Sequence, residues 1–217
     1  MLIPRLVVFD MAGTTVEDGG QVPAAFTASL AAHGIVVTPE QISRVRGASK
    51  RQAIRALAGG NEEAARIYAA FQQDLAARYQ TEGVKAIAGA ANVLAALRAR
   101  GVKVALTTGF DRDITALLMA ALAWQDAVDT VVCGDDVASG RPAPDLIHEA
   151  MANVGVTEPS QVATVGDTSL DLEAGAAAGV GWNIGVLSGA HGRDALERSP
   201  HTHILGSVAD LRPLWRL

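Results

Sequence analysis

Short apolar runs alternate with longer amphipathic segments along most of this 217-residue chain. Most of the apolar runs end at glycine or at a polar turn, as strands of a parallel sheet commonly do. We predict six strands, at residues 6–10, 102–107, 130–133, 161–165, 181–186 and 203–205. Helices are predicted between most of them, at residues 90–100, 113–123, 144–154 and 169–178. The pattern therefore predicts an α/β fold, with a parallel sheet covered by helices.

One long segment breaks this alternation. Between about residues 17 and 83 there is no clear strand, and four helices are predicted instead, at residues 24–33, 39–46, 50–58 and 62–79. Glycine-containing joins at residues 18–20 and 82–83 flank the segment. We predict a helical cap at residues 18–83 that closes over a core formed by residues 1–17 and 84–217. The alternative is that these helices simply pack on the core as one body.

Composition narrows the class of protein further. The net charge of −5 and the absence of a basic run argue against nucleic-acid binding. The first apolar stretch is short and ends at Asp10, which is not the pattern of a signal peptide or a membrane span. The single cysteine, Cys133, suits a reducing compartment and is expected to be a small buried side chain. We therefore expect a cytoplasmic protein that contacts neither nucleic acid nor membrane.

Polar groups follow the predicted strands where parallel sheets place their chemistry. Asp10 ends the first strand and is followed by a Gly-Thr-Thr turn. A lone aspartate there is often only a cap, and Thr14 could likewise cap the next helix. The functional interpretation makes Asp10 a nucleophile that attacks phosphorus, with Thr14 in a loop that cradles the phosphoryl oxygens.

Three further strand ends carry candidate groups. Asp167 and Asp171, four residues apart after the fourth strand, could gather a hard cation such as Mg²⁺, one as a ligand and one as support. Thr108, preferred over Thr107, could bond a phosphoryl oxygen beside Gly109, and the cation of Arg141 could neutralise charge on the nucleophile and the phosphoryl group. Each of these groups alone could have a purely structural role, so only their combination indicates a functional site.

Together, in this order, these motifs resemble the haloacid dehalogenase superfamily across essentially the whole chain. The resemblance implies a Rossmann-like core with a small helical cap, and Asp10 as the nucleophile that forms a phospho-aspartyl intermediate. It also implies Mg²⁺ held by Asp10, Asp167 and the main-chain carbonyl of Ala12. Thr108 would bind phosphate, and Arg141 would take the cationic role that many members give to lysine.

Ala12 and Lys50 point to one branch of that superfamily. Its phosphatases resemble one another in carrying an aspartate two residues after the nucleophile, where this chain has Ala12. The motifs Asp-x-Ala-Gly-Thr-Thr, Thr-Thr-Gly-aromatic and Gly-Arg-Pro look like the phosphonatase (phosphonoacetaldehyde hydrolase) branch. In that branch a cap lysine forms a Schiff base with an aldehyde, and Lys50 stands at the matching point. We expect Arg46, Arg51 and a helix N-terminus to disfavour its protonated form.

The chain also departs from that branch. Arg46 stands where phosphonatases tend to have methionine, Ala53 where they have histidine and Phe110 where they have tyrosine. Arg46 adds a cation to the face of the cap, which suggests a more anionic or larger substrate. We expect a hydrolase for a small phosphonate or phosphate. The alternatives are a phosphatase for small phosphate monoesters, similar to phosphoglycolate phosphatases, and a non-catalytic module. The resemblance makes a homodimer a fair guess.

A few other polar residues have weaker functional interpretations. Asp135 and Asp136 could orient Arg141, or simply form a turn. His191 and Arg193 are expected in a surface loop rather than at the rim of the site. His201 and His203 are spaced on one strand face, but without an acidic or thiol neighbour they do not suggest a metal site.

Overall fold

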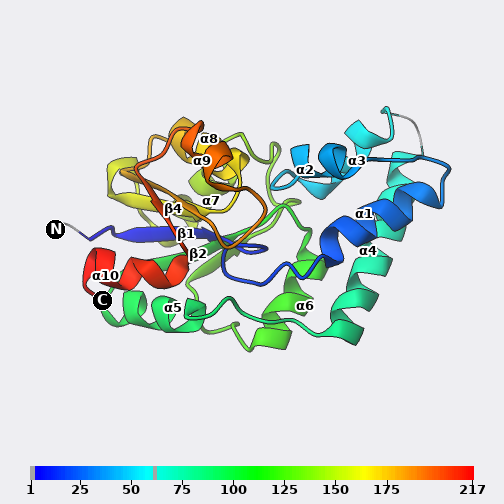
Figure 1. Cartoon of the computed structure of the whole chain (residues 1–217). Helices are drawn as coiled ribbons and strands as arrows, with labels where there is room; N and C mark the ends of the chain where they lie inside the picture. The colour runs from blue at the N-terminus through cyan, green and yellow to red at the C-terminus, as the bar shows by residue number, and fades with distance from the viewer. Residues whose placement is uncertain (1–2, 61–62) are drawn as a thin grey trace.

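The computed structural model describes residues 3–60 and 63–217, and a six-stranded parallel sheet forms its centre. The strand order is β3-β2-β1-β4-β5-β6. Figure 1 labels three neighbouring strands of this sheet, β2, β1 and β4. The strands are β1 (Leu6–Asp10), β2 (Lys103–Thr107), β3 (Thr130–Val132), β4 (Val162–Gly166), β5 (Trp182–Val186) and β6 (His203–Leu205). All six predicted strands are confirmed, with ends that differ by no more than one residue. Because every pairing is parallel, the carboxyl ends of the strands share one edge.

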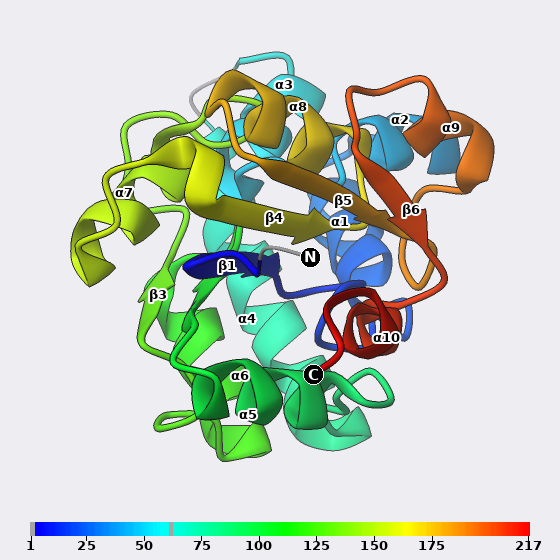
Figure 2. The same cartoon turned by 90° about the vertical axis from the view of Figure 1, so that its left-hand side faces the viewer.

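Alternate residues of the central strand β1 pack against opposite layers of helices. Val7 and Phe9 belong to one apolar cluster, whereas Leu6 and Val8 belong to the other. Figure 2 shows these layers above and below the sheet. One layer contains α5 (Ala90–Ala99), α6 (Arg112–Leu122) and α10 (Leu211–Trp215), and the other contains α7 (Asp145–Val154), α8 (Ser169–Ala177) and α9 (Arg193–Glu197). The short helices α9 and α10 and two 3-10 turns, at Pro159–Gln161 and Val208–Asp210, were not predicted.

Four helices are inserted between β1 and α5, and they lie to one side of the sheet (Figure 1). They are α1 (Gln21–Ala31), α2 (Pro39–Arg44), α3 (Lys50–Leu57) and α4 (Ala64–Glu82). A capping box between Thr38 and Gln41 starts α2. The predicted start of the fourth helix, Glu62, lies outside the described residues. Because α4 continues to Glu82, that residue is helical and not part of a loose join.

The helical insertion, which we call the cap, rests on the core. Phe26 of α1 and Phe71 of α4 pack with ring centroids 4.6 Å apart, inside an apolar cluster that continues to Val93 and Leu97 of α5. Arg51 of α3 also forms an ion pair with Asp111 of the core, at 2.6 Å. The exact division at residues 18–83 stays a prediction. Within the described part of the chain, every helix is too short or too polar to cross a bilayer.

Candidate active site

The loop after β1 places Asp10 at the edge of the sheet. The Met11 carbonyl accepts hydrogen bonds from the backbone N–H groups of residues 14–16, at 2.8 to 3.2 Å, so the chain turns back on itself at once. Gly13 has a φ of 96°, and a Cβ at this position would overlap the carboxylate of Asp167. Glycine is therefore required here, both for the turn and for the close approach of the Asp167 loop.

Asp167 follows β4, which pairs directly with β1, so its carboxylate lies beside that of Asp10 in one pocket. It is 1% exposed, and its Oδ2 accepts a hydrogen bond from the Ala190 N–H at 2.6 Å. Its Oδ1 accepts one from the Thr14 hydroxyl at 3.1 Å. Thr14 was expected to bind phosphate, but its side chain is fully buried and directed at Asp167. The structure thus gives Thr14 the task of orienting a carboxylate.

The two carboxylates form an electrostatically costly pair. Burial raises the pKa of both Asp10 and Asp167 above the ordinary aspartate value. The negative charge of Asp10 raises the pKa of Asp167 further, whereas Arg141 opposes the rise at Asp10. Ala12 lines the same pocket. Two adjacent carboxylates and a main-chain carbonyl are hard oxygen donors, which fit Mg²⁺ well. A divalent cation between the carboxylates would also lower both pKa values, because it favours the ionised forms.

Arg141 binds the other side of Asp10. Its Nη1 donates to Asp10 Oδ1 at 2.6 Å, its Nη2 donates to the Thr107 hydroxyl at 2.8 Å, and its Nε pairs with Asp171 Oδ1 at 2.9 Å. Nη1 also lies 3.4 Å from the Gly47 carbonyl of the cap. With an exposure of only 5%, the guanidinium is fixed in place. Arg141 therefore lies where it can neutralise charge on Asp10, the residue that the sequence predicts to be the nucleophile.

The structure changes the role expected for Asp171 and favours the turn interpretation of Asp135 and Asp136. Asp171 was expected to support a cation at Asp167, but it pairs with Arg141 and accepts hydrogen bonds from the Thr168 N–H at the start of α8. Asp136, which could have oriented Arg141, instead forms an ion pair with Arg112 at 2.5 Å. Asp135 accepts a hydrogen bond from the backbone N–H of the same arginine. The latter two acids therefore stabilise a turn.

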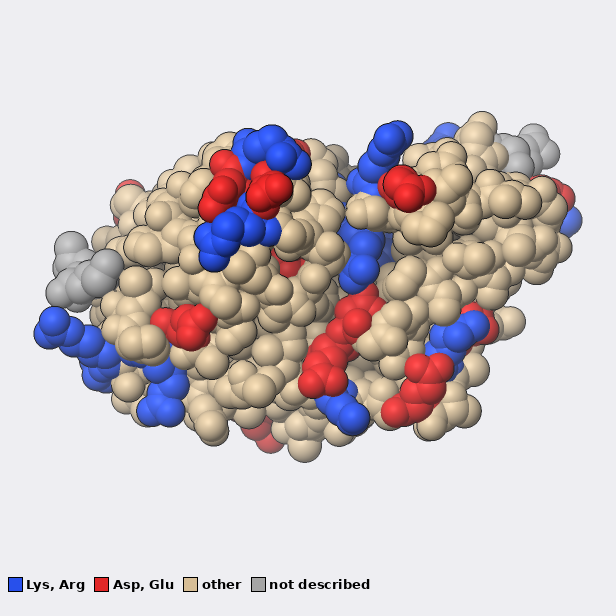
Figure 3. All heavy atoms as spheres, in the orientation of Figure 1, with Lys and Arg blue, Asp and Glu red and all other residues tan. Residues whose placement is uncertain are grey.

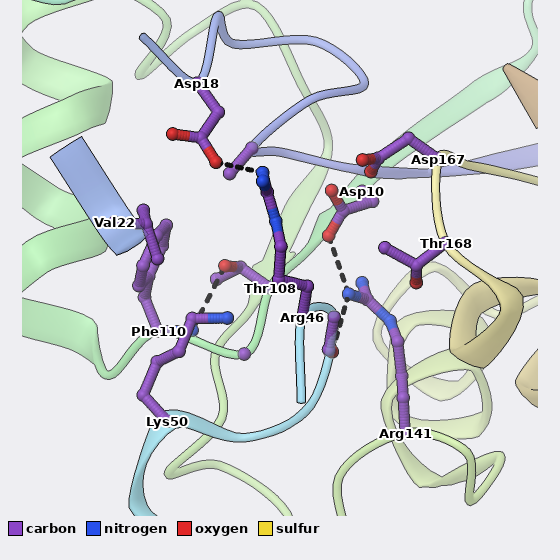
Figure 4. A pocket seen from close by; sticks show the side chains of 13 residues that line it. Asp10, Asp18, Val22, Arg46, Lys50, Thr108, Phe110, Arg141, Asp167 and Thr168 are labelled. Atoms are coloured by element: carbon purple, nitrogen blue, oxygen red, sulfur yellow. Dashed lines mark hydrogen bonds and ion pairs between the residues drawn. The ribbon is translucent and has the colours of Figure 1, made fainter. Parts of the chain in front are cut away.

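Lys50 is the first residue of α3 and points into the pocket (Figure 4). Its side chain is buried, with the Nζ 3.2 Å from the Ala48 carbonyl and 5.0 Å from the centre of the Phe110 ring. The pKa of the Lys50 amine is lowered to about 8, chiefly by burial. Asp10 opposes this shift, and Arg141 and Arg46 add to it. The sequence predicted that neighbouring cations and the helix N-terminus would disfavour the protonated form, but burial is the largest cause. Arg51 is not among the main causes of this shift, and its guanidinium pairs with Asp111.

The loop after β2 lines the pocket between the residues of the core and those of the cap. Thr108 lines the pocket and is buried, and its hydroxyl accepts a hydrogen bond from the Phe110 N–H at 3.1 Å. The Gly109 carbonyl accepts the Lys50 backbone N–H at 3.0 Å, and a Cβ on Gly109 would overlap the Ala48 carbonyl. Only glycine permits this approach of cap and core, which holds Lys50 over the sheet edge.

Arg46 crosses the pocket and forms an ion pair with Asp18 (Figure 4). Asp18 is buried, and its second oxygen accepts the Gly20 N–H at 3.1 Å. Sequence reasoning missed Asp18 because an acid beside two glycines was interpreted as part of a loose join. Charged side chains of both signs meet along the groove between core and cap (Figure 3). His191 lies behind Asp167, where its ring accepts the Ser169 N–H at 3.0 Å.

The candidate residues therefore converge on one pocket. Asp10, Ala12, Arg46, Lys50, Thr108, Gly109, Arg141 and Asp167 line it together, along with Asp18, Val22, Gly47, Phe110 and Thr168. Thr14 and Asp171 stand behind this lining. Arg193 is exposed and pairs with Glu197 outside the site, as expected for a surface loop.

Comparison with known proteins identifies the class of protein. The haloacid dehalogenase-like hydrolase family matches residues 7–183, so the chain belongs to this family of hydrolases. This confirms the expectation of a hydrolase with a Rossmann-like core. The alternative of a non-catalytic module is not supported. The chain is also similar to solved structures, among them a hydrolase from Pseudomonas syringae with a TM-score of 0.88 and 26% identity, covering 98% of each chain.

Relatives of the phosphonatase branch are prominent in these comparisons. The phosphonoacetaldehyde hydrolase of Bacteroides fragilis is 32% identical over 213 residues, covering 90% of this chain and 80% of the relative. That of Paraburkholderia phytofirmans is 29% identical over 254 residues, covering 97% and 93%. A phosphonoacetaldehyde hydrolase-like protein from Oleispira antarctica has a TM-score of 0.85 and 25% identity, covering 99% and 93%. The resemblance to the phosphonatase branch is thereby confirmed.

Proposed function

We propose that this hydrolase cleaves the carbon–phosphorus bond of a small oxo-phosphonate, with Mg²⁺ as cofactor. Asp10 is the nucleophile and Lys50 forms an imine with the carbonyl group of the substrate. One observation supports this most: Lys50 is buried in the pocket of Asp10 and Asp167 with its pKa lowered to about 8. A lysine with that pKa has an appreciable neutral, nucleophilic fraction near neutral pH.

The metal would lie at the core end of the pocket, which we define by Asp10, Ala12, Thr108, Arg141 and Asp167. Asp10, Asp167 and the Ala12 carbonyl would hold it, while Thr14 and the Ala190 N–H keep Asp167 in position. When bound, Mg²⁺ supplies positive charge that offsets repulsion between the carboxylate and the phosphoryl oxygens. Arg141, Thr108 and the backbone of Gly109 bind and orient the phosphoryl group from the opposite side.

The proposed reaction balances with one water consumed overall. The Lys50 amine adds to the carbonyl and water leaves, which forms an iminium. The Asp10 carboxylate then attacks phosphorus, the carbon–phosphorus bond breaks, and its electron pair moves into the iminium to form an enamine. A water hydrolyses the aspartyl phosphate to release phosphate. The enamine takes a proton on carbon, and a second water hydrolyses the resulting imine and frees Lys50.

Ala12 is consistent with this route and less so with ester hydrolysis. Breaking a phosphate ester expels an alkoxide, which benefits from an acid beside the nucleophile. The Ala12 side chain carries no proton to donate. In the imine route the electron sink is the iminium, so the departing carbon needs no acid at that position.

The test is a phosphate-release screen of phosphonates and small phosphate esters, with Mg²⁺ and with EDTA. We expect release from an oxo-phosphonate that requires Mg²⁺ and is lost in both Asp10→Asn and Lys50→Ala. Lys50→Arg keeps the positive charge but cannot form the imine, so it should be equally inactive. Ester hydrolysis that survives Lys50→Ala and is lost in Asp10→Asn would replace this proposal with the phosphatase alternative.

A further inference from the structure

The half of the pocket nearest the cap carries more positive than negative charge. We call it the cap end and define it by Asp18, Val22, Arg46, Lys50 and Phe110. Its two cations face one acid, and that acid is already paired with Arg46. Across residues 3–60 and 63–217, no carboxylate lies within ion-pair distance of Lys50. Lys50 therefore has no ion-pair partner, and Asp10 and Asp18 act on its charge only from beyond ion-pair distance.

Arg46 has hydrogen-bonding capacity to spare. Its Nη2 donates to Asp18, whereas its Nε and Nη1 donate to no acceptor in the described part of the chain. The side chain is 22% exposed and stands in the pocket itself (Figure 4). A guanidinium presents its donors in a planar fork that matches the two oxygens of a carboxylate. Asp18 holds Arg46 by one donor and leaves the others available.

Buried charge without a partner is unfavourable, so the cap end is better matched by an anion than by a neutral group. The lysine bears a positive charge both as the ammonium and as the iminium of the proposed reaction. One negative charge from the substrate, together with Asp18, would balance Arg46 and Lys50. The apolar side chains of Val22 and Phe110 leave the guanidinium as the group suited to that charge.

We propose that Arg46, held in place by Asp18, binds a carboxylate of the substrate, and that the substrate is an oxo-phosphonate bearing a carboxylate. The smallest such compound is 3-phosphonopyruvate, in which the carboxylate is attached to the carbonyl carbon that Lys50 would attack. This substrate class rests on the proposed function, but the recognition of the carboxylate by Arg46 does not depend on turnover. Arg46 is then the residue that determines specificity, and Asp18 is a positioning residue.

Binding of two unreactive ligands tests the inference without any chemistry. In 3-phosphonopropanoate and propylphosphonate the phosphonate and the two adjacent CH₂ groups are the same, and only the former ends in a carboxylate. We expect calorimetry with Mg²⁺ to show that the wild-type protein prefers 3-phosphonopropanoate by about tenfold or more, as a charge-assisted hydrogen bond would give. In Arg46→Gln that preference should fall to near one.

Arg44 provides a matched control, because it carries the same charge on the same segment of the cap but is exposed to solvent. Arg44→Gln should keep the full preference for the carboxylated ligand. Equal binding of the two ligands by the wild type overturns the inference, as does a preference that persists in Arg46→Gln or disappears in Arg44→Gln. If the preference behaves as expected while no phosphonate releases phosphate, the proposed reaction fails and the assignment of Arg46 stands.

Discussion

The two ends of the pocket differ in how firmly their side chains are held. At the core end, Arg141 uses Nε, Nη1 and Nη2 on three different partners, and both oxygens of Asp167 accept hydrogen bonds. At the cap end, among the described residues, the Nζ of Lys50 hydrogen-bonds only to the Ala48 carbonyl and lies over the Phe110 ring, and the guanidinium of Arg46 pairs only with Asp18. The core end is fixed before substrate arrives, whereas the cap end keeps unused donors.

This difference separates two tasks. Groups that stabilise charge during a reaction act best when they need no rearrangement, and those of the core end meet that condition. Groups that select a substrate need hydrogen-bond donors and charge that other protein groups do not already use. The groups of the cap end have both. We therefore assign phosphoryl chemistry to the strand ends and the choice of substrate to the cap.

The largest expected effect comes from removing the nucleophile at the core end. Asp10→Asn should reduce phosphate release by about 10⁴-fold or more, because an amide cannot form the aspartyl phosphate. Thermal unfolding of the variant, followed alongside, shows whether the fold is retained. A well-folded variant that keeps a tenth of the wild-type rate would contradict the assignment of Asp10.

At the cap end we expect that replacing Lys50 abolishes the reaction but stabilises the fold. Burial lowers the pKa of Lys50 from 10.5 to about 8, so the unfolded chain binds more protons between these values and the charged lysine opposes folding below about 8. Lys50→Met should then raise the free energy of unfolding by up to about 3 kcal/mol at neutral pH. Urea unfolding measures this, and the gain should disappear above the pKa of the unfolded lysine. A loss of stability at neutral pH would show that Lys50 is well accommodated.

Asp171 should have a smaller effect at the core end, because it acts through Arg141. Asp171→Asn removes the charge paired with the Nε and should lower kcat by about ten- to a hundredfold with little change in KM. Asp136→Asn is the matched control, because Asp136 pairs with Arg112 instead. If Asp136→Asn lowered kcat as much as Asp171→Asn, the proposed positioning of Arg141 would be wrong.

The last expected effect, which requires no substitution, is a pH dependence of the cap end. Only the neutral amine of Lys50 attacks a carbonyl, and its pKa is about 8, so kcat/KM for an oxo-phosphonate should rise about tenfold per pH unit below that value and level off above it. Phosphate release measured across this range provides the profile. A profile that is flat between pH values of about 6 and 8 would argue against amine attack.

The sequence was sufficient for the sheet and for the placement of the reacting groups. A strand end is a local feature, and parallel topology brings the ends of β1, β2 and β4 together, so Asp10, Thr108 and Asp167 could be predicted to meet. Lys50 was placed by resemblance alone, and its burial could not be foreseen from the charges around it.

The orientations of other side chains could not be predicted, because they depend on contacts between distant segments. Thr14 meets Asp167 across 153 positions of the chain, and Arg46 meets Asp18 across 28. Thr14 therefore bonds a carboxylate where phosphate was expected. Asp18 could not be predicted as a site residue. In a glycine-rich join, the sequence does not distinguish an acid that forms an ion pair from one that is solvated.

Covalent trapping of Lys50 tests the central claim most directly. The protein would be incubated with phosphonoacetaldehyde and Mg²⁺, reduced with borohydride, digested and analysed by mass spectrometry. The account predicts a stable adduct on the peptide that contains Lys50, and none in Lys50→Arg. Phosphate release from phosphonoacetaldehyde with no adduct at Lys50, or with an adduct on another lysine, would contradict it.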